Sequence, residues 1–212
     1  MFHVKHRDNK FDIIVVGGGH AGIEASFVAA NMGASVALVT MNLHTIGRPS
    51  CNPSIGGTAK GHLVKEIDAL GGAMGVLADR GGLLFKMLNR SKGPAVWSPR
   101  TQIDKDLYPK YALELLIKQP NLTLIKDTVD EIIVENNKIA GIKTKSNEYL
   151  RAKAVILCAG TFLNGKMFTG LDVTYGGRYG EPASDRVSDL LAAYGLEKGR
   201  LKTGTPPRVR AK

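Results

Sequence analysis

The chain has 212 residues, enough for one substantial hydrophobic core or two small ones, and 43% of them are hydrophobic, as in ordinary globular proteins. Its 29 basic and 19 acidic residues leave a net charge of +10, which is concentrated in residues 198–212 and in a second stretch over residues 86–100. This distribution favours a polyanionic partner, either a nucleic acid or a phosphorylated ligand, although a solvated basic face is the simpler interpretation.

The N-terminal segment argues against secretion and membrane insertion. Residues 1–10 are polar and charged, unlike a secretory signal, and the apolar run after them is too short to span a bilayer. Cys51 and Cys158 occupy unrelated positions and do not make a disulfide framework. We therefore expect a cytoplasmic protein without membrane association.

Residues 11–40 carry the pattern of a strand, a glycine-rich turn, a helix and a second strand. The apolar run at 13–16 is typical of a strand that is buried on both faces. The motif Gly17-x-Gly19-x-x-Gly22 then opens a helix that is expected to run to about Asn31, and residues 35–40 form the second strand. The spacing predicts one βαβ unit of the Rossmann type.

The three glycines of this motif have separate roles in a dinucleotide site. Gly17 permits the tight turn, Gly19 lets a pyrophosphate approach the backbone, and Gly22 lets the helix pack against the strand. The helix N-terminus adds free N–H groups and a partial positive charge. The alternative is a tight strand–helix turn that binds nothing. One position departs from the fingerprint, because Thr40 stands where Asp or Glu usually binds the ribose hydroxyls, which weakens a simple NAD interpretation.

The region after the second strand contains Cys51. Residues 44–57, with two prolines and paired glycines, are predicted to form a loop, and Thr58–Leu70 a helix that ends at Gly71. If this loop faces a cofactor, a thiolate at Cys51 is a candidate nucleophile. If it does not, Cys51 is a small buried thiol in a packed loop.

Residues 106–160 predict a helix followed by β structure. The helix over 106–120 is amphipathic, and its core candidates are Leu113, Leu116 and Ile117. Residues 122–159 are expected to be strands, with a hairpin turn at 135–137. The apolar strand at 154–160 would rejoin the parallel sheet and would carry Cys158 as a core residue. A meander and a second glycine-ended strand suit FAD better than NAD.

Six stretches of the chain carry a family resemblance. They are "DIIVVGGGHAGIEAS", "SCNPSIGGTAKGHLVKEIDALGG", "LNRSKGPAVWSPRTQIDKDLY", "AGTFLNGK", "GGRYGEPAS" and "GRLKTGTPPR". Together they resemble the tRNA uridine 5-carboxymethylaminomethyl modification enzyme family (MnmG/GidA), and the resemblance extends over nearly all of the chain. The "CNPSIGG" and "LKTGTPPR" blocks are far more specific than the glycine fingerprint.

The resemblance implies a set of site residues. Cys51 matches a family cysteine proposed to act in the reaction, as a nucleophile at C6 of uridine. Val129 would contact the adenine side of FAD, and Ser184 would be a further FAD contact. Trp97 stands where the family pattern leads us to expect a basic residue. The residues implied to hold the FAD pyrophosphate are Gly17, Gly18, Gly19, His20, Ala21 and Gly22.

The resemblance also implies an activity and partners. Family members are FAD proteins that modify C5 of the wobble uridine of tRNA together with a GTPase partner protein. Methylenetetrahydrofolate supplies the one-carbon unit and NADH reduces the flavin. The full-length protein is expected to be a homodimer. Family proteins are longer than this chain, so we expect an N-terminal portion that is inactive alone.

The predicted fold is therefore α/β, a Rossmann-like FAD-binding domain with a β-meander insertion and the start of a second, substrate- or NADH-binding domain. The expected boundaries are 1–200 for the FAD-binding domain with its inserted loops and 201–212 for the start of a further region. No metal site is expected. The alternatives are a general FAD oxidoreductase, a folate-dependent tRNA methyltransferase flavoprotein and a non-catalytic nucleotide- or RNA-binding module. A disulfide reductase would need a cysteine pair close in sequence, which Cys51 and Cys158 are not.

Overall fold

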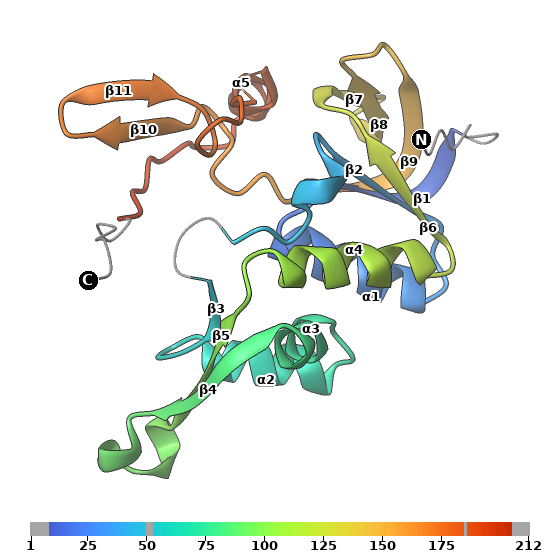
Figure 1. The fold of residues 1–212 in the computed structure, drawn as a ribbon. Helices are drawn as coiled ribbons and strands as arrows, with labels where there is room; N and C mark the ends of the chain where they lie inside the picture. The colour runs from blue at the N-terminus through green and yellow to red at the C-terminus, as the bar shows by residue number, and fades with distance from the viewer. Residues whose placement is uncertain (1–8, 50–52, 185, 205–212) are drawn as a thin grey trace.

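The computed structural model describes residues 9–49, 53–184 and 186–204, and the largest sheet among them has six strands and lies at the upper right of Figure 1. The strands are arranged in the order β6-β2-β1-β9-β8-β7. The first four are parallel to one another, whereas β8 and β7 are antiparallel. The order of the parallel strands is that of the doubly wound Rossmann fold, in which the third, second, first and fourth strands lie side by side. The strands are β1 (Lys10–Val16), β2 (Val36–Thr40), β6 (Leu122–Lys126), β7 (Val129–Glu135), β8 (Lys138–Thr144) and β9 (Tyr149–Leu157).

The two central strands are buried on both faces, as their continuous apolar sequences predict. On one face, Val15 and Leu38 pack against helices α1 (His20–Asn31) and α4 (Leu107–Lys118), which lie together below the sheet in Figure 1. On the other face, Ile14 and Val39 belong to a second core that includes residues of β7, β8 and β9 and of α5 (Arg186–Ala193). Successive strand residues point to opposite faces, so one apolar run supplies both cores.

Several predicted elements are confirmed. The βαβ unit is present, and its helix ends at Asn31 before Gly33, which has a φ of +89°. The hairpin turn joins β7 to β8, and both Asn136 and Asn137 have positive φ angles, 51° and 60°. This conformation is the one that two-residue hairpin loops prefer and asparagine tolerates.

A second sheet, with three strands in the order β3-β5-β4, is inserted between β2 and α4. The prediction of a loop over residues 44–57 was wrong for part of this sheet. Strand β3 lies inside that predicted loop. The following helix begins at Gly61 rather than at Thr58, because Ala59 adopts a left-handed conformation with φ of +58°. The elements of this insertion are β3 (Ser54–Gly56), α2 (Gly61–Ala69), α3 (Met74–Arg80), β4 (Gly82–Leu88) and β5 (Ser98–Ile103), with short 3-10 turns η1 (Leu43–Thr45), η2 (Arg90–Lys92) and η3 (Pro94–Val96).

The last strand of the parallel set differs from its prediction. β9 begins at Tyr149 and ends at Leu157, and it pairs with β1 in parallel as expected. One of its faces is exposed, including Ala154 and Ile156, although the apolar sequence predicted a buried strand. In the paired register these two residues lie beside Ile13 and Val15, on the helix side of the sheet. Helix α1 contacts β1 and β2 but leaves this face of β9 uncovered within the described residues.

The remainder of the chain forms a hairpin of β10 (Lys166–Thr169) and β11 (Asp172–Tyr175), followed by α5. No helix among the described residues is both long enough and apolar enough to cross a membrane. Residues 201–204 adopt no helix or strand, and the division of the chain into 1–200 and 201–212 stays a prediction.

Helix α4 provides a test of the core. Leu116 is fully buried against α1 and the sheet, whereas Ile117, which was predicted to be a core residue, is 64% exposed, because adjacent helical positions point in different directions. We expect Leu116→Ala to lower the free energy of unfolding by about 2–5 kcal/mol. Ile117→Ala, the matched control, should cost less than about 1 kcal/mol. Urea denaturation of both variants measures the difference, and equal losses would contradict this core assignment.

Candidate functional site

The turn between β1 and α1 is built from backbone that leaves no room for side chains. Gly17 has a φ of +107°, and a Cβ atom added to it would lie 2.4 Å from the carbonyl oxygen of Cys158. A Cβ on Gly22 would lie 1.8 Å from the carbonyl oxygen of Gly17. The roles predicted for these two glycines, a tight turn and close packing of the helix, therefore match the geometry.

Gly19 differs from its neighbours because the space beside it is open. It is exposed, it caps the N-terminus of α1, and an added Cβ would meet no protein atom within 4 Å. Its φ of −74° is one that any residue can adopt. Neither packing nor backbone strain therefore requires glycine here. The remaining explanation for a residue without a side chain is that a ligand approaches the backbone at this point.

A cavity of about 260 Å³ opens at the carboxyl ends of β1, β2 and β9. In doubly wound proteins this edge of the sheet is where ligands bind. The ends of these strands form one wall of the cavity, and the segment that follows β9 forms a second wall. The lining residues are Val16, Gly17, Gly18, Gly19, His20, Val39, Thr40, Met41, Thr45, Arg48, Asp127, Thr128, Val129, Leu157, Cys158, Ala159, Gly160, Thr161, Phe162, Leu163, Arg178, Glu181, Ser184 and Val187.

Most of the predicted cofactor-binding residues lie together in this lining. Val129 and Ser184 reach it from β7 and from the segment before α5, far along the chain from the glycine turn. The other predicted residues in the lining are Gly17, Gly18, Gly19 and His20. Ala21 and Gly22, the next two residues of α1, are not part of it. Binding of a cofactor by these residues stays a prediction. The predicted nucleophile Cys51 lies outside the described residues.

His20, the first residue of α1, has a buried ring. The ring stacks on Tyr108 at a centroid distance of 5.5 Å, and its buried Nε2 has no hydrogen-bond partner among the described residues. Burial, and secondarily the positive charge of Arg178, lower the pKa of His20 below its ordinary value of 6.5. The imidazole is therefore neutral at physiological pH.

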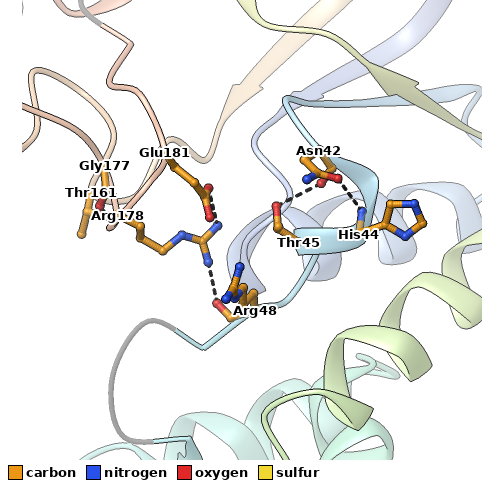
Figure 2. A network of polar contacts seen from close by, with 8 residues as sticks. All are labelled: Asn42, His44, Thr45, Arg48, Thr161, Gly177, Arg178 and Glu181. Carbon is orange, nitrogen blue, oxygen red and sulfur yellow. Dashed lines mark hydrogen bonds and ion pairs between the residues drawn. The ribbon is translucent and has the colours of Figure 1, made fainter. Parts of the chain in front are cut away.

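Arg178 links the segment that follows β9 to Arg48, which follows η1, as Figure 2 shows. Its Nη1 donates a hydrogen bond of 2.8 Å to the carbonyl oxygen of Arg48, and its Nη2 pairs with Glu181 at 3.1 Å. The Nε atom is buried without a partner among the described residues. The side chain of Arg178 is thus largely buried, and its two terminal nitrogens are committed to Arg48 and Glu181.

The carboxyl end of β6 brings one more charged group to the lining. The backbone N–H of Asp127 donates to the carbonyl oxygen of Thr40 at 3.0 Å, so the two residues lie side by side at the edge of the sheet. The carboxylate of Asp127 accepts from the backbone N–H of Thr128 at 2.7 Å and from the hydroxyl of Ser146.

The second cysteine is consistent with the structural role predicted for it. Cys158 follows β9, packs against the main hydrophobic core and also reaches the cavity lining. Burial raises the pKa of its thiol, which opposes formation of the nucleophilic thiolate. Among the described residues, no group of three or more His, Cys, Asp or Glu side chains is arranged to hold a metal ion.

Sequence reasoning assigned no role to four charged residues of the lining, namely Arg48, Asp127, Arg178 and Glu181. Asp127 carried a usable signal, because it directly follows a predicted strand; that strand, β6, is parallel to β2 in the structure and ends at the ligand-binding edge. Arg178 and Glu181 lie in the quoted block "GGRYGEPAS", but the hydrogen bond of Arg178 to Arg48 joins residues 130 positions apart in the chain. No local pattern predicts such a contact.

The strand order, the glycine turn and the position of the cavity define a protein of the Rossmann-like α/β class. Within that class the family is specific. The sequence profile described as "Glucose inhibited division protein A" matches residues 12–212, and the chain belongs to this GidA family, which confirms the resemblance.

Relatives of known name agree with this assignment. The tRNA uridine 5-carboxymethylaminomethyl modification enzyme MnmG of Thermodesulfovibrio yellowstonii is 54% identical over 207 residues, which cover 98% of this chain and 33% of the relative. The MnmG of Phocaeicola vulgatus is 50% identical over 95% of this chain and 32% of its own length. The chain thus spans about one third of the length of these relatives.

Solved structures show the same fold. Aquifex aeolicus GidA superposes with a TM-score of 0.89 at 49% identity, covering 93% of this chain and 33% of that one. The GidA-related protein of Thermus thermophilus gives a TM-score of 0.63 at 22% identity, covering 88% and 69% respectively, which supports the fold alone. The predicted α/β, Rossmann-like class is therefore confirmed.

The buried imidazole of His20 makes stability depend on pH. Because its pKa is lowered in the folded state, the unfolded chain binds the proton more readily as the pH falls below 6.5. We expect wild-type protein to lose more unfolding free energy than His20→Gln when the pH is lowered from 7.5 to 5.5. Urea titrations of both proteins at the two pH values measure this difference, and an identical loss in both would show that His20 does not contribute.

Proposed function

We propose that this chain is the FAD-binding portion of an enzyme that adds a (carboxymethyl)aminomethyl group to C5 of the wobble uridine of tRNA. The observation that carries the proposal is the cavity at the carboxyl ends of β1, β2 and β9, in a chain 54% identical to a protein named for this modification. When bound, FAD would supply the electron-transfer chemistry that such a modification needs.

The residues of the cavity fit a dinucleotide. The free space beside Gly19, at the N-terminus of a 12-residue helix, suits a pyrophosphate. His20, Arg178, Val129 and Ser184 lie in the same lining, so residues far apart in the sequence face one space.

The basic stretch over residues 86–100 supports tRNA as the substrate. Lys86, Arg90 and Lys92 are exposed on β4 and η2 of the inserted sheet, where the side chains of Phe85 and Trp97 are also exposed. Cations bind the phosphate backbone, and aromatic rings stack on unpaired bases such as those of an anticodon loop. This combination favours recognition of a looped nucleic acid.

The finer parts of the proposal come from the family resemblance. They are NADH as reductant, methylenetetrahydrofolate as one-carbon donor, a GTPase partner protein, a homodimeric full-length protein and a cytoplasmic location.

FAD binding is tested through Gly19. We expect Gly19→Leu to fold normally but to lose at least about tenfold in FAD affinity, because the leucine side chain would occupy the space open to the pyrophosphate. Gly199→Leu is the matched control, since an added Cβ there also meets nothing and the site lies outside the lining. The visible absorption spectrum and a flavin titration of each purified protein measure binding. Normal FAD content in Gly19→Leu would refute the assignment of the turn.

Catalysis is tested through Cys51. If its thiolate attacks C6 of uridine and thereby activates C5, Cys51→Ser in the full-length protein should lower the rate of tRNA modification by two or more orders of magnitude, about 3 kcal/mol or more of barrier. The FAD spectrum of the variant should be unchanged. Mass spectrometry of the modified nucleosides measures the activity. Undiminished modification would remove Cys51 from the reaction.

A further inference from the structure

The dinucleotide fingerprint of this chain lacks one of its usual parts. The residue at the end of β2, which normally carries the carboxylate that binds the adenosine ribose, is Thr40. Its hydroxyl is close to the turn, since a Cβ on Gly18 would lie 2.9 Å from Oγ1 of Thr40. A hydroxyl can accept a hydrogen bond from a ribose, but it lacks the charge and the paired oxygens of a carboxylate.

A carboxylate is nevertheless present at this edge of the sheet, one strand away. Asp127 directly follows β6, which pairs in parallel with β2 so that Thr40 lies opposite Lys126. The N–H of Asp127 extends the ladder by donating to the carbonyl oxygen of Thr40 at 3.0 Å. Neighbouring strands are about 4.8 Å apart, so a side chain after β6 can reach the space that a carboxylate after β2 would reach.

The environment of Asp127 keeps it charged and fixes its position at the edge of the sheet. Partial burial acts to raise its pKa, but hydrogen bonds from Ser146, Thr144 and Thr128 outweigh that effect, and the pKa lies below its ordinary value. The backbone N–H of Thr128 donates to Oδ1 and the hydroxyl of Ser146 donates to Oδ2, so the carboxylate is held beside the cavity that it lines.

The other carboxylate of the lining is committed elsewhere. Glu181 pairs with Arg178 at 3.1 Å on the opposite wall of the cavity. Among the described residues of the lining, Asp127 is thus the carboxylate adjacent to β2. Val129, for which the family resemblance implies contact with the adenine side of FAD, follows two residues later and shares the lining.

We propose that Asp127 binds the hydroxyl groups of the adenosine ribose of the dinucleotide. It takes the role that a carboxylate at the position of Thr40 usually has. The proposal rests on the dinucleotide site of the proposed function and assigns its adenosine end. It also gives the site a selectivity, because a negative charge at the ribose favours free hydroxyls and repels a 2′-phosphate.

The test compares Asp127→Asn with wild-type full-length protein in binding two ligands. These are FAD and the FAD analogue whose adenosine ribose lacks the 2′- and 3′-hydroxyls, and flavin fluorescence quenching measures both affinities. Asparagine is nearly isosteric and retains an acceptor for Thr128 and a donor for Ser146, so the turn is preserved. Asp130→Asn is the matched control, because Asp130 pairs with Arg186 and does not line the cavity.

We expect wild type and Asp130→Asn to bind FAD about ten- to a hundredfold more tightly than the dideoxy analogue, the range typical of hydrogen bonds to a charged group. In Asp127→Asn the preference should shrink to a few fold, because FAD affinity falls while analogue affinity changes little. An equal loss for both ligands would mean that Asp127 only shapes the turn, and would overturn the proposal. So would a wild-type protein that binds both ligands equally well, even if Asp127→Asn failed to fold. Absence of FAD binding in wild type would refute the proposed function itself, so the two failures are distinguishable.

Discussion

The structure depends on a close backbone contact at the end of the parallel sheet. The carbonyl oxygen of Cys158 lies 2.4 Å from where a Cβ of Gly17 would be, and the carbonyl oxygen of Gly17 lies 1.8 Å from where a Cβ of Gly22 would be, so neither position can hold a side chain. Backbone hydrogen bonds from Gly17 to Val39 and from Cys158 to Val16 fix the three strands at the same level. The floor of the cavity is therefore main chain, whose position is set by sterics and hydrogen bonds rather than by adjustable side chains.

The second wall of the cavity is held by side chains, whereas the strand ends are held by main-chain contacts. The segment after β9 packs through Val187 into the second hydrophobic core, and the hydrogen bond from Arg178 to the carbonyl oxygen of Arg48 ties it to the segment after β2. The ion pair of Arg186 with Asp130 is solvent-exposed on the arginine side, where such pairs contribute little, and Asp130 does not line the cavity. A large ligand that contacts both the strand ends and the segment after β9 would hold these two parts together. Its binding would therefore add to the stability of the folded state.

The parts of the fold that local pattern determines were predictable. The apolar run before Gly17, the spacing of the glycines and the Asn136-Asn137 turn each specify a conformation within a few residues. The inserted β3-β5-β4 sheet was missed because β3 has only three residues and pairs with a strand more than forty positions away. Ile117 was misassigned because a helix with Leu115, Leu116 and Ile117 in succession does not reveal which of them its neighbours cover.

In the site, too, the parts formed by neighbouring residues were predictable from the sequence, and the parts formed by residues far apart in the chain were not. The glycine turn has a sequence signature because a pyrophosphate bound to backbone N–H groups requires a particular chain path. A ribose requires only an acceptor at the correct place on the sheet edge, and that place can be reached from β2 or from its neighbour β6. A carboxylate at Asp127 instead of at position 40 would therefore bind the ribose in the same way, but it would not stand where the sequence motif expects it. Motifs report the main-chain parts of a binding site more faithfully than the side-chain parts, since a side chain can be supplied by any strand that ends nearby.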